Sequence, residues 1–225
     1  MDVIHQLAEG GAEAGTIVTA GEQLEGRGSR GRTWHSPPGG LWLSALFRPP
    51  ATGAIEVMSL RVGLAVADAL EPLVSLPIQV KWPNDLMLGE RKLGGILCEA
   101  RWQGETLGWI AIGVGVNVRN QVPDGLTQAA ISLSQVRPEI TVDDVVGPIV
   151  AALRKIDLRG ARLSPGELDR FAERDWLNGR QIGAPVRGRV SGLGDDGALL
   201  VQTADQSEIP LRSGSVELAA VSPSR

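Results

Sequence analysis

Two long apolar segments near the middle of the chain constrain its fold more than any other feature. Residues 93–100 and 107–118 are separated by a turn near Gln103-Gly104-Glu105, which predicts two long strands joined by that turn. Strand periodicity places Gly113, Gly115 and Asn117 on one face of the second strand. A strand face without side chains allows a flat ligand to lie against it, and it equally allows a helix to pack tightly over the glycines.

Apolar periodicity and turn residues predict the elements around this pair of strands. We expect helices over residues 2–9, 55–73, 141–156 and 165–174, and strands over 16–20, 41–47 and 78–82. Beyond Trp176 the pattern changes to short strands at 185–191, 197–203, 207–212 and 215–219, separated by Gly and Asp turns. These predict a small all-β unit, a small barrel, that docks on the larger domain because its own core is marginal. We therefore expect domains of residues 1–176 and 177–225.

Composition excludes several classes of function. The chain has 225 residues, of which 43% are hydrophobic, and its formal net charge of -4 disfavours a general nucleic-acid binder. Its single cysteine, Cys98, cannot form an intrachain disulfide and is predicted to be a small buried residue on a strand. The first residues do not resemble a signal peptide and no apolar run would span a membrane, so a soluble cytoplasmic protein without membrane partners is expected.

The segment Gly26-Arg27-Gly28-Ser29-Arg30-Gly31-Arg32-Thr33-Trp34, called the Gly-Arg loop below, alternates glycine with arginine. Glycine lets the backbone approach a ligand, and arginine supplies forked donors for phosphate and carboxylate. The loop lacks the Gly-Lys-Ser/Thr of a Walker loop, and its match to GxGxxG is weak because no helix follows. The alternatives are a solvated basic loop or one that contacts RNA. Trp34 suits either ordinary packing or stacking on a nucleobase.

A second polar cluster follows the predicted strand at 78–82. Lys81-Trp82-Pro83-Asn84-Asp85 brings a cation, an amide and a carboxylate together. Asp85 could help to hold Mg²⁺ on ATP, or Asn84 and Asp85 could simply cap an Asx turn. Lys92 stands at the entry of the next strand, where Gly94 and Gly95 would allow a ligand or another chain to lie close. A lone lysine at a turn is otherwise solvated.

Taken together, these blocks resemble the biotin–protein ligase family. The family pattern of a glutamine, GRGxxGRxW, a strand with a serine, KWPND, KxxGIL and GxGxN appears in order over most of residues 16–118. The resemblance implies an α+β catalytic domain related to class II aminoacyl-tRNA synthetases and lipoate ligases. It also implies that the C-terminal segment is a small SH3-like β-barrel.

The resemblance further implies ATP-dependent activation of biotin and its transfer to a lysine of a biotin carboxyl carrier protein, such as that of acetyl-CoA carboxylase. ATP with Mg²⁺ would be required, and the chain would be a monomer or a homodimer. Lys92 and Arg27 would be catalytic, and Asp85 would be the metal ligand. The residues implied for biotin are Gln23, Gly26, Arg27, Gly28, Ser29 and Lys92. The residues implied for the nucleotide are Arg30, Arg32, Trp34 and Asn117.

Two departures from the family pattern stand at the N-terminus. Met1-Asp2 begins where an Asp-Ser-Thr-Asn-like motif of the biotin pocket should end, which suggests a start that has been assigned too late. A helix-turn-helix domain is also absent, so the non-DNA-binding class is expected. The rival functions are an impaired biotin- or nucleotide-binding module that lacks part of the pocket, a lipoate-type acyl-adenylating ligase, and a nucleic-acid-binding protein.

Overall fold

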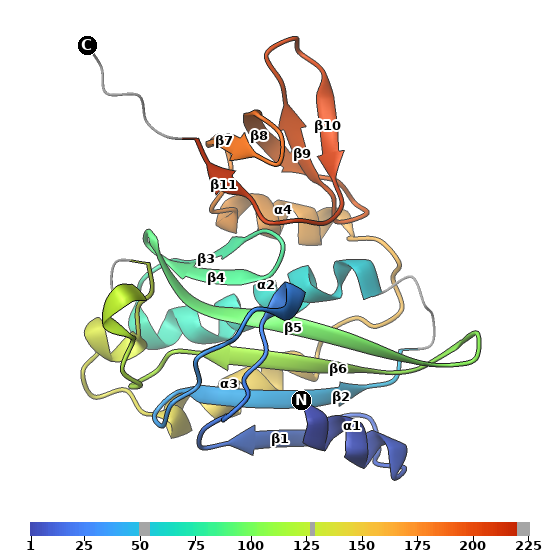
Figure 1. Ribbon diagram of the computed structural model, residues 1–225, viewed down its shortest axis with the longest axis vertical. Helices are drawn as coiled ribbons and strands as arrows, with labels where there is room; N and C mark the ends of the chain where they lie inside the picture. The colour runs from blue at the N-terminus through green and yellow to red at the C-terminus, as the bar shows by residue number, and fades with distance from the viewer. Residues whose placement is uncertain (50–54, 127–128, 220–225) are drawn as a thin grey trace.

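The larger part of the molecule is built on a six-stranded antiparallel sheet (Figure 1). The computed structural model describes residues 1–49, 55–126 and 129–219. The strands are β1 (Ile17–Ala20), β2 (Leu41–Phe47), β3 (Ile78–Lys81), β4 (Asp85–Leu88), β5 (Arg91–Gln103) and β6 (Thr106–Val116). Their spatial order is β1-β2-β6-β5-β4-β3. The predicted pair of long strands is confirmed as the β5–β6 hairpin, which lies at the centre of the sheet.

Four α-helices accompany the sheet in the described residues. They are α1 (Asp2–Glu9), α2 (Ile55–Val74), α3 (Val142–Leu153) and α4 (Pro165–Arg174). The helices α3 and α4 each begin with a capping box, at Thr141 and Ser164, as Ser and Thr favour. All four were predicted, although α3 ends earlier than expected. Within the described part of the chain, no helix is both long and apolar enough to cross a membrane.

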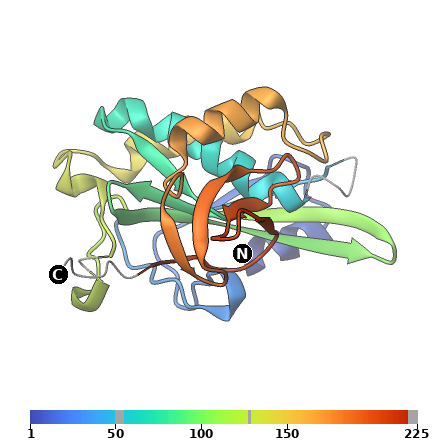
Figure 2. The same ribbon diagram turned by 90° about the horizontal axis from the view of Figure 1, so that it is seen from above.

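The two faces of the sheet are covered by different elements because side chains alternate along each strand. On β6, Ile110 and Ile112 join the main core with α2, whereas Trp109 and Ala111 pack against α1. Seen from above, α2 and α4 lie on one side of the β5–β6 hairpin and the Gly-Arg loop, in blue, lies on the other (Figure 2). The glycine positions of β6 therefore fall on the side of α1 and the Gly-Arg loop.

The C-terminal part forms a second antiparallel sheet, which confirms the predicted small all-β unit. Its strands are β7 (Gln181–Ala184), β8 (Gly188–Leu193), β9 (Leu199–Gln202), β10 (Glu208–Leu211) and β11 (Glu217–Leu218), in the order β10-β9-β8-β7-β11. The expected strand over 185–191 is wrong in its boundaries, because β7 ends before Pro185 and β8 begins at Gly188. The short strand β4 was also missed, since four residues next to a turn carry too little periodicity.

The second sheet packs on the larger part through two buried tryptophans. Trp82 Nε1 donates to the Gly197 carbonyl at 2.9 Å, and Trp176 Nε1 donates to the Gly89 carbonyl at 2.9 Å. Both indoles belong to one core cluster that also contains Ile182. The expected docking is therefore observed, whereas the domain division between residues 176 and 177 stays a prediction.

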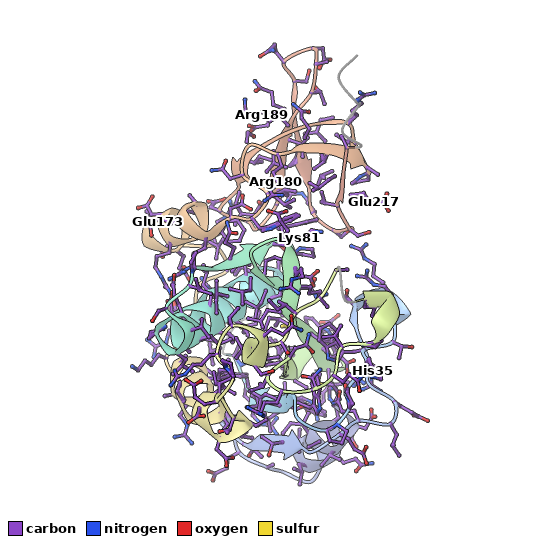
Figure 3. The ribbon with its side chains drawn as sticks, turned by 90° about the vertical axis from the view of Figure 1, so that its left-hand side faces the viewer. His35, Lys81, Glu173, Arg180, Arg189 and Glu217 are labelled. Carbon is purple, nitrogen blue, oxygen red and sulfur yellow. The ribbon has the colours of Figure 1, made fainter. Side chains whose placement is uncertain are left out.

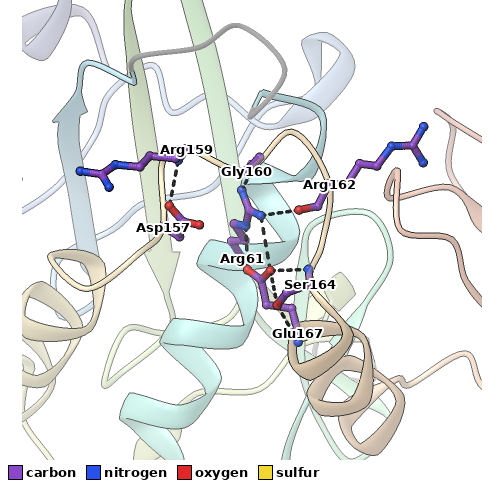
Figure 4. A network of polar contacts seen from close by, with 7 residues as sticks. All are labelled: Arg61, Asp157, Arg159, Gly160, Arg162, Ser164 and Glu167. Atoms are coloured by element: carbon purple, nitrogen blue, oxygen red, sulfur yellow. Dashed lines mark hydrogen bonds and ion pairs between the residues drawn. The ribbon is translucent and has the colours of Figure 1, made fainter.

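A buried arginine on α2 ties the segment before α4 to the larger part (Figure 4). Arg61 is 4% exposed. Its guanidinium donates to Glu167 Oε1 at 2.7 Å, to the Gly160 carbonyl at 2.6 Å and to the Arg162 carbonyl at 2.7 Å. Because a buried charge is tolerated only when it is paired and hydrogen-bonded, these contacts stabilise the connection before α4.

We expect Arg61→Ala to lower the free energy of unfolding by about 3–5 kcal/mol, because it leaves a partly buried carboxylate and two carbonyls without their donor. Chemical denaturation measures this change. The control is Arg162→Ala, which removes a side chain that is 66% exposed and should cost less than about 1 kcal/mol. Equal losses for the two variants would contradict this account of Arg61.

Asp175 is a buried carboxyl at the junction between α4 and the second sheet. It is 7% exposed and accepts from the Leu177 amide at 2.8 Å. Burial raises the pKa of Asp175 to about 6, and the hydrogen bond from Leu177 opposes this shift only in part. The folded protein therefore holds this proton more tightly than the unfolded chain, whose aspartates titrate near about pH 3.9.

Protonation of Asp175 contributes to the free energy of unfolding. This contribution is fully present below about pH 4 and is lost as the pH rises through about 6. We expect Asp175→Asn to remove this loss, so that the variant gains up to about 3 kcal/mol over the natural chain between about pH 4 and 7. Denaturant unfolding across this pH range measures the difference. Asp143→Asn at an exposed position should show no such gain, and an Asp175→Asn profile parallel to that of the natural chain would be the contrary result.

Candidate functional site

A cavity of about 470 Å³ opens on the side of the sheet that carries the β6 glycines. Gly113 and Gly115 form part of its floor, together with Gly95 of β5. The Gly-Arg loop and the turn before β4 contribute further walls. Because glycine has no side chain, the cavity reaches the backbone of the two central strands.

The Gly-Arg loop folds back on itself in the manner of a small hairpin. The Trp34 amide donates to the Gly26 carbonyl at 2.8 Å, and the Gly28 amide donates to the Arg32 carbonyl at 2.7 Å. Arg30 and Gly31 turn the chain with φ of 61° and 70°. A methyl group on Gly26 would lie 2.2 Å from the Trp34 carbonyl oxygen, so that position requires glycine.

The Trp34 indole lies over Gly115 and Gly95 of the floor, whereas Met1 lies over Gly113. A methyl group on Gly115 would come within 2.9 Å of Trp34 Nε1, and one on Gly95 within 3.5 Å of the ring. The bare strand face is therefore covered by an aromatic side chain of the chain itself and not by a helix. Among the described residues, Trp34 Nε1 is buried without a hydrogen-bond partner. Buried donors are normally satisfied, so this N–H, which lies against Gly115, is an exception.

Lys92 and Asp85 form an ion pair at the edge of the cavity. Lys92 Nζ lies 2.5 Å from Asp85 Oδ1 and 5.0 Å from the centroid of the Trp34 ring. Asp85 is placed by the β4–β5 pairing opposite Gly95. Asn84 Nδ2 donates to the Ile96 carbonyl at 2.7 Å, so the amide fastens the turn to β5 and does not cap its own turn. The end of the Lys92 side chain therefore lies beside Gly95, because a methyl group there would be 3.7 Å from Lys92 Cε.

Gln23 and Asn117 are the two predicted amides of the site, and both line the cavity. Gln23 Oε1 accepts from Ser36 Oγ at 2.7 Å. Asn117 Oδ1 accepts from Asn120 Nδ2 at 3.0 Å, and Asn117 is 6% exposed. These bonds fix the orientation of both side chains before any ligand arrives.

Most of the predicted site residues meet in this one cavity. Those that line it are Gln23, Arg27, Gly28, Ser29, Arg32, Trp34, Asp85, Lys92 and Asn117. Gly26 and Arg30 do not line it. Gly26 instead accepts the hydrogen bond from the Trp34 amide that closes the loop. Arg30 points towards the C-terminal segment, because a methyl group on Gly214 would lie 3.8 Å from Arg30 Nη2.

One wall of the cavity was missed by the sequence analysis. It comes from the stretch after β6 and includes Asn120, Val122, Leu126 and Ala129. Backbone bonds hold this stretch beside Lys92, whose amide donates to the Ala129 carbonyl at 2.8 Å. The stretch has no helical or strand periodicity, so its position could be found only from the tertiary structure.

A smaller hollow of about 180 Å³ adjoins the cavity at the base of the second sheet. Arg32 and Lys81 border it, together with residues 214–217. Lys81 Nζ lies 5.0 Å from the centroid of the Trp176 ring, on which Arg180 also stacks at 3.8 Å (Figure 3). Burial lowers the pKa of Lys81, so a nearby anion would stabilise its charged form.

The described part of the site therefore combines cations, an indole and a backbone floor of glycines. Cys98 lies on β5, as predicted, and packs against the main core; the residue as a whole is partly exposed, but desolvation raises the pKa of its thiol to about 12. A thiol with that pKa stays protonated and unreactive. The arginines and Lys92 give the cavity groups that bind anions, and Trp34 gives it a flat aromatic face.

Comparisons with known proteins identify the class more closely. The model of the biotin/lipoate A/B protein ligase family matches residues 3–117, and the model of the biotin protein ligase C-terminal domain matches residues 179–219. The solved biotin protein ligase from Aquifex aeolicus in complex with biotin and ATP superposes with a TM-score of 0.79. That match has 26% identity and covers 96% of this chain and 94% of the other.

The chain belongs to the biotin/lipoate A/B protein ligase family, and the resemblance to its biotin protein ligases is confirmed. It is 32% identical over 211 residues to the bifunctional ligase/repressor BirA of Bacillus subtilis, covering 88% of this chain and 65% of the relative. It is 29% identical over 214 residues to the biotin–[acetyl-CoA-carboxylase] ligase of Paracoccus denitrificans, covering 85% and 86%. The chain thus spans slightly less than two thirds of the length of the Bacillus relative.

Proposed function

We propose that this chain uses ATP to convert biotin to biotinyl-5'-AMP and transfers the biotinyl group to a lysine of a biotin carboxyl carrier protein. The observation that carries the proposal is the convergence of Arg27, Arg32 and Lys92 on one cavity beside Trp34. The names of the Aquifex and Paracoccus relatives support biotin and ATP as ligands and a carboxylase as the source of the acceptor.

In the first step a biotin carboxylate oxygen attacks the α-phosphorus of ATP, and pyrophosphate leaves. Both reactants are anions, so their approach is opposed by repulsion. Arg27 and Lys92 lower this repulsion and stabilise the charge that builds up in the transition state. Arg32 and Lys81 border the adjoining hollow, where they would receive the phosphates of the leaving group.

In the second step the lysine amine of the acceptor attacks the acyl carbon, the amide bond forms, and AMP leaves with the oxygen that came from biotin. No side-chain nucleophile is needed, which agrees with the protonated Cys98. The adenylate must be kept from water before the acceptor arrives. The Gly-Arg loop, which includes Trp34 and lines the cavity, would provide this shield.

Mg²⁺ is implied by the use of ATP, and Asp85 is the candidate ligand. Within the described part of the chain, no three His, Cys, Asp or Glu side chains come close enough to hold a metal ion. Asp85 is also already paired with Lys92. This arrangement fits an ion that arrives on the phosphates, because Mg²⁺ commonly uses one or two carboxylates together with phosphate oxygens and water. When bound, the ion would neutralise charge on the leaving pyrophosphate.

Exchange of labelled pyrophosphate into ATP tests the proposal, because it requires only the first step. We expect exchange by the purified chain with biotin and none with lipoate or octanoate. Exchange driven by lipoate would favour a lipoate-type ligase. The absence of exchange with each acid would favour a binding module and overturn the proposed activity.

We expect Lys92→Ala to slow biotin-dependent exchange by about 100-fold or more, since removal of one charged donor to a transition state has that effect. The matched control is Lys155→Ala, at an exposed position outside the cavity, which should leave the rate unchanged. A rate close to that of the natural chain in Lys92→Ala would remove Lys92 from the mechanism.

We expect Trp34→Ala to raise the KM for ATP by about tenfold while the KM for biotin changes little, because aromatic stacking on a nucleobase is worth about 1–3 kcal/mol. Initial rates at varied ATP and varied biotin separate the two constants. Trp102→Ala, which changes an indole that is 51% exposed on the β5–β6 hairpin, is the control. A selective rise in the KM for biotin would contradict the placement of the base beside Trp34.

A further inference from the structure

A chain of polar contacts runs from the core to the Gly-Arg loop. Trp109 Nε1 donates to His5 Nδ1 at 3.0 Å, and His5 Nε2 lies 2.8 Å from Glu99 Oε2. The Glu99 carboxylate meets Arg27 on both oxygens, with Oε1 3.4 Å from Nε and Oε2 3.5 Å from Nη2. Three elements, α1, β5 and β6, thus supply side chains that lead to one arginine of the loop.

The direction of these hydrogen bonds is fixed by Trp109. An indole nitrogen can only donate, so His5 Nδ1 has to accept, and the ring hydrogen of neutral His5 is then on Nε2. That hydrogen points at Glu99 Oε2. His5 and Trp109 are 5% and 4% exposed, so packing as well as hydrogen bonding holds the imidazole in this orientation.

Glu99 is therefore held more firmly than the other carboxylate that contacts Arg27. The side chain of Glu99 is 20% exposed, whereas that of Asp2, 2.7 Å from Arg27 Nη2, is 69% exposed. Exposed ion pairs are weak and easily exchanged. Arg101 also faces Glu99, at 3.9 Å, but its side chain is 49% exposed. The Asp2 contact is shorter than those of Glu99, at 2.7 Å against 3.4 and 3.5 Å. Because Asp2 is the more exposed and Glu99 is held by His5, we expect an incoming anion to replace Asp2 and not Glu99.

We propose that Glu99, oriented by His5, is a positioning residue that holds Arg27 over the cavity before the ligands bind. The Glu99 contact shifts the loop towards the arrangement that receives the biotin carboxylate, and the ligand then takes the place of Asp2 on the guanidinium. The importance of this positioning for catalysis rests on the proposed function. The ordering of the Gly-Arg loop by the Glu99–Arg27 contact does not depend on the proposed function, and it can be measured in a chain without activity.

Tryptic cleavage of the ligand-free chain measures that hold directly. Cleavage after Arg30 and Arg32, followed by mass spectrometry, reports how often the loop opens. We expect Glu99→Gln, which keeps the shape and loses the charge, to be cut about fivefold faster or more, with unchanged global stability in denaturant. Glu139→Gln, which removes a carboxylate from the exposed Arg137–Glu139 pair, should be cut at the rate of the natural chain.

A double-mutant comparison shows whether Glu99 acts through Arg27. Arg27→Gln should also speed cleavage after Arg30 and Arg32, and adding Glu99→Gln to it should speed cleavage no further. Independent, multiplying effects would overturn the proposal, because Glu99 would then act elsewhere. Cleavage of Glu99→Gln at the natural rate would overturn it as well.

Steady-state kinetics of pyrophosphate exchange test whether the positioning of Arg27 by Glu99 matters for biotin binding. We expect Glu99→Gln to raise the KM for biotin about fivefold or more with a smaller change in kcat, because a less ordered arginine weakens ground-state binding. Glu99→Asp should recover part of the loss. A fall in kcat alone would contradict positioning. If the natural chain shows no exchange, the proposed function fails, and the cleavage comparison still decides whether Glu99 holds the loop.

Discussion

Strand β6 has two faces of different chemistry, and the position of the site depends on this difference. One face carries Ile110, Ile112 and Val114, which lie in the main core with α2. The other face changes along the strand from Trp109 and Ala111 under α1 to the glycines of the cavity floor. The same alternation that buries the core thus leaves a bare stretch of backbone beside it, and no separate element is needed to build the floor of the pocket.

Two of the cations above that floor are paired with carboxylates of the chain itself. Lys92 is paired with Asp85, and Arg27 is paired with Asp2 and Glu99. The hydrogen bond that Arg27 donates to Asp2, aided by the charge of Glu99, raises the pKa of Arg27, and the same hydrogen bond lowers the pKa of Asp2. The site that we propose for two anionic substrates needs several cations close together, which repel each other. Internal carboxylates relieve this repulsion, and under the proposed function carboxylate and phosphate groups of the ligands would replace part of them.

The sequence was informative where the physical signal is local. The β5–β6 hairpin, α1 and α2 follow from periodicity and turn residues, and the ordered motifs predicted that Arg27, Trp34 and Lys92 share one site. Longer-range features could not be predicted. Strand β4 is too short to show a period. The wall formed by Asn120, Val122, Leu126 and Ala129 has no period, and Arg30 looks equivalent to Arg32 in the sequence although only Arg32 faces the cavity.

The central claim is that a carboxylate oxygen of biotin attacks the α-phosphorus of ATP in this cavity. Biotin labelled with oxygen-18 in its carboxylate tests that claim most directly, with a biotin carboxyl carrier domain or hydroxylamine as acceptor. The account predicts that the AMP released in each turnover carries one labelled oxygen, because the bridging oxygen stays with phosphorus when the acyl–oxygen bond breaks. Unlabelled AMP, or ADP and labelled phosphate in its place, would contradict it.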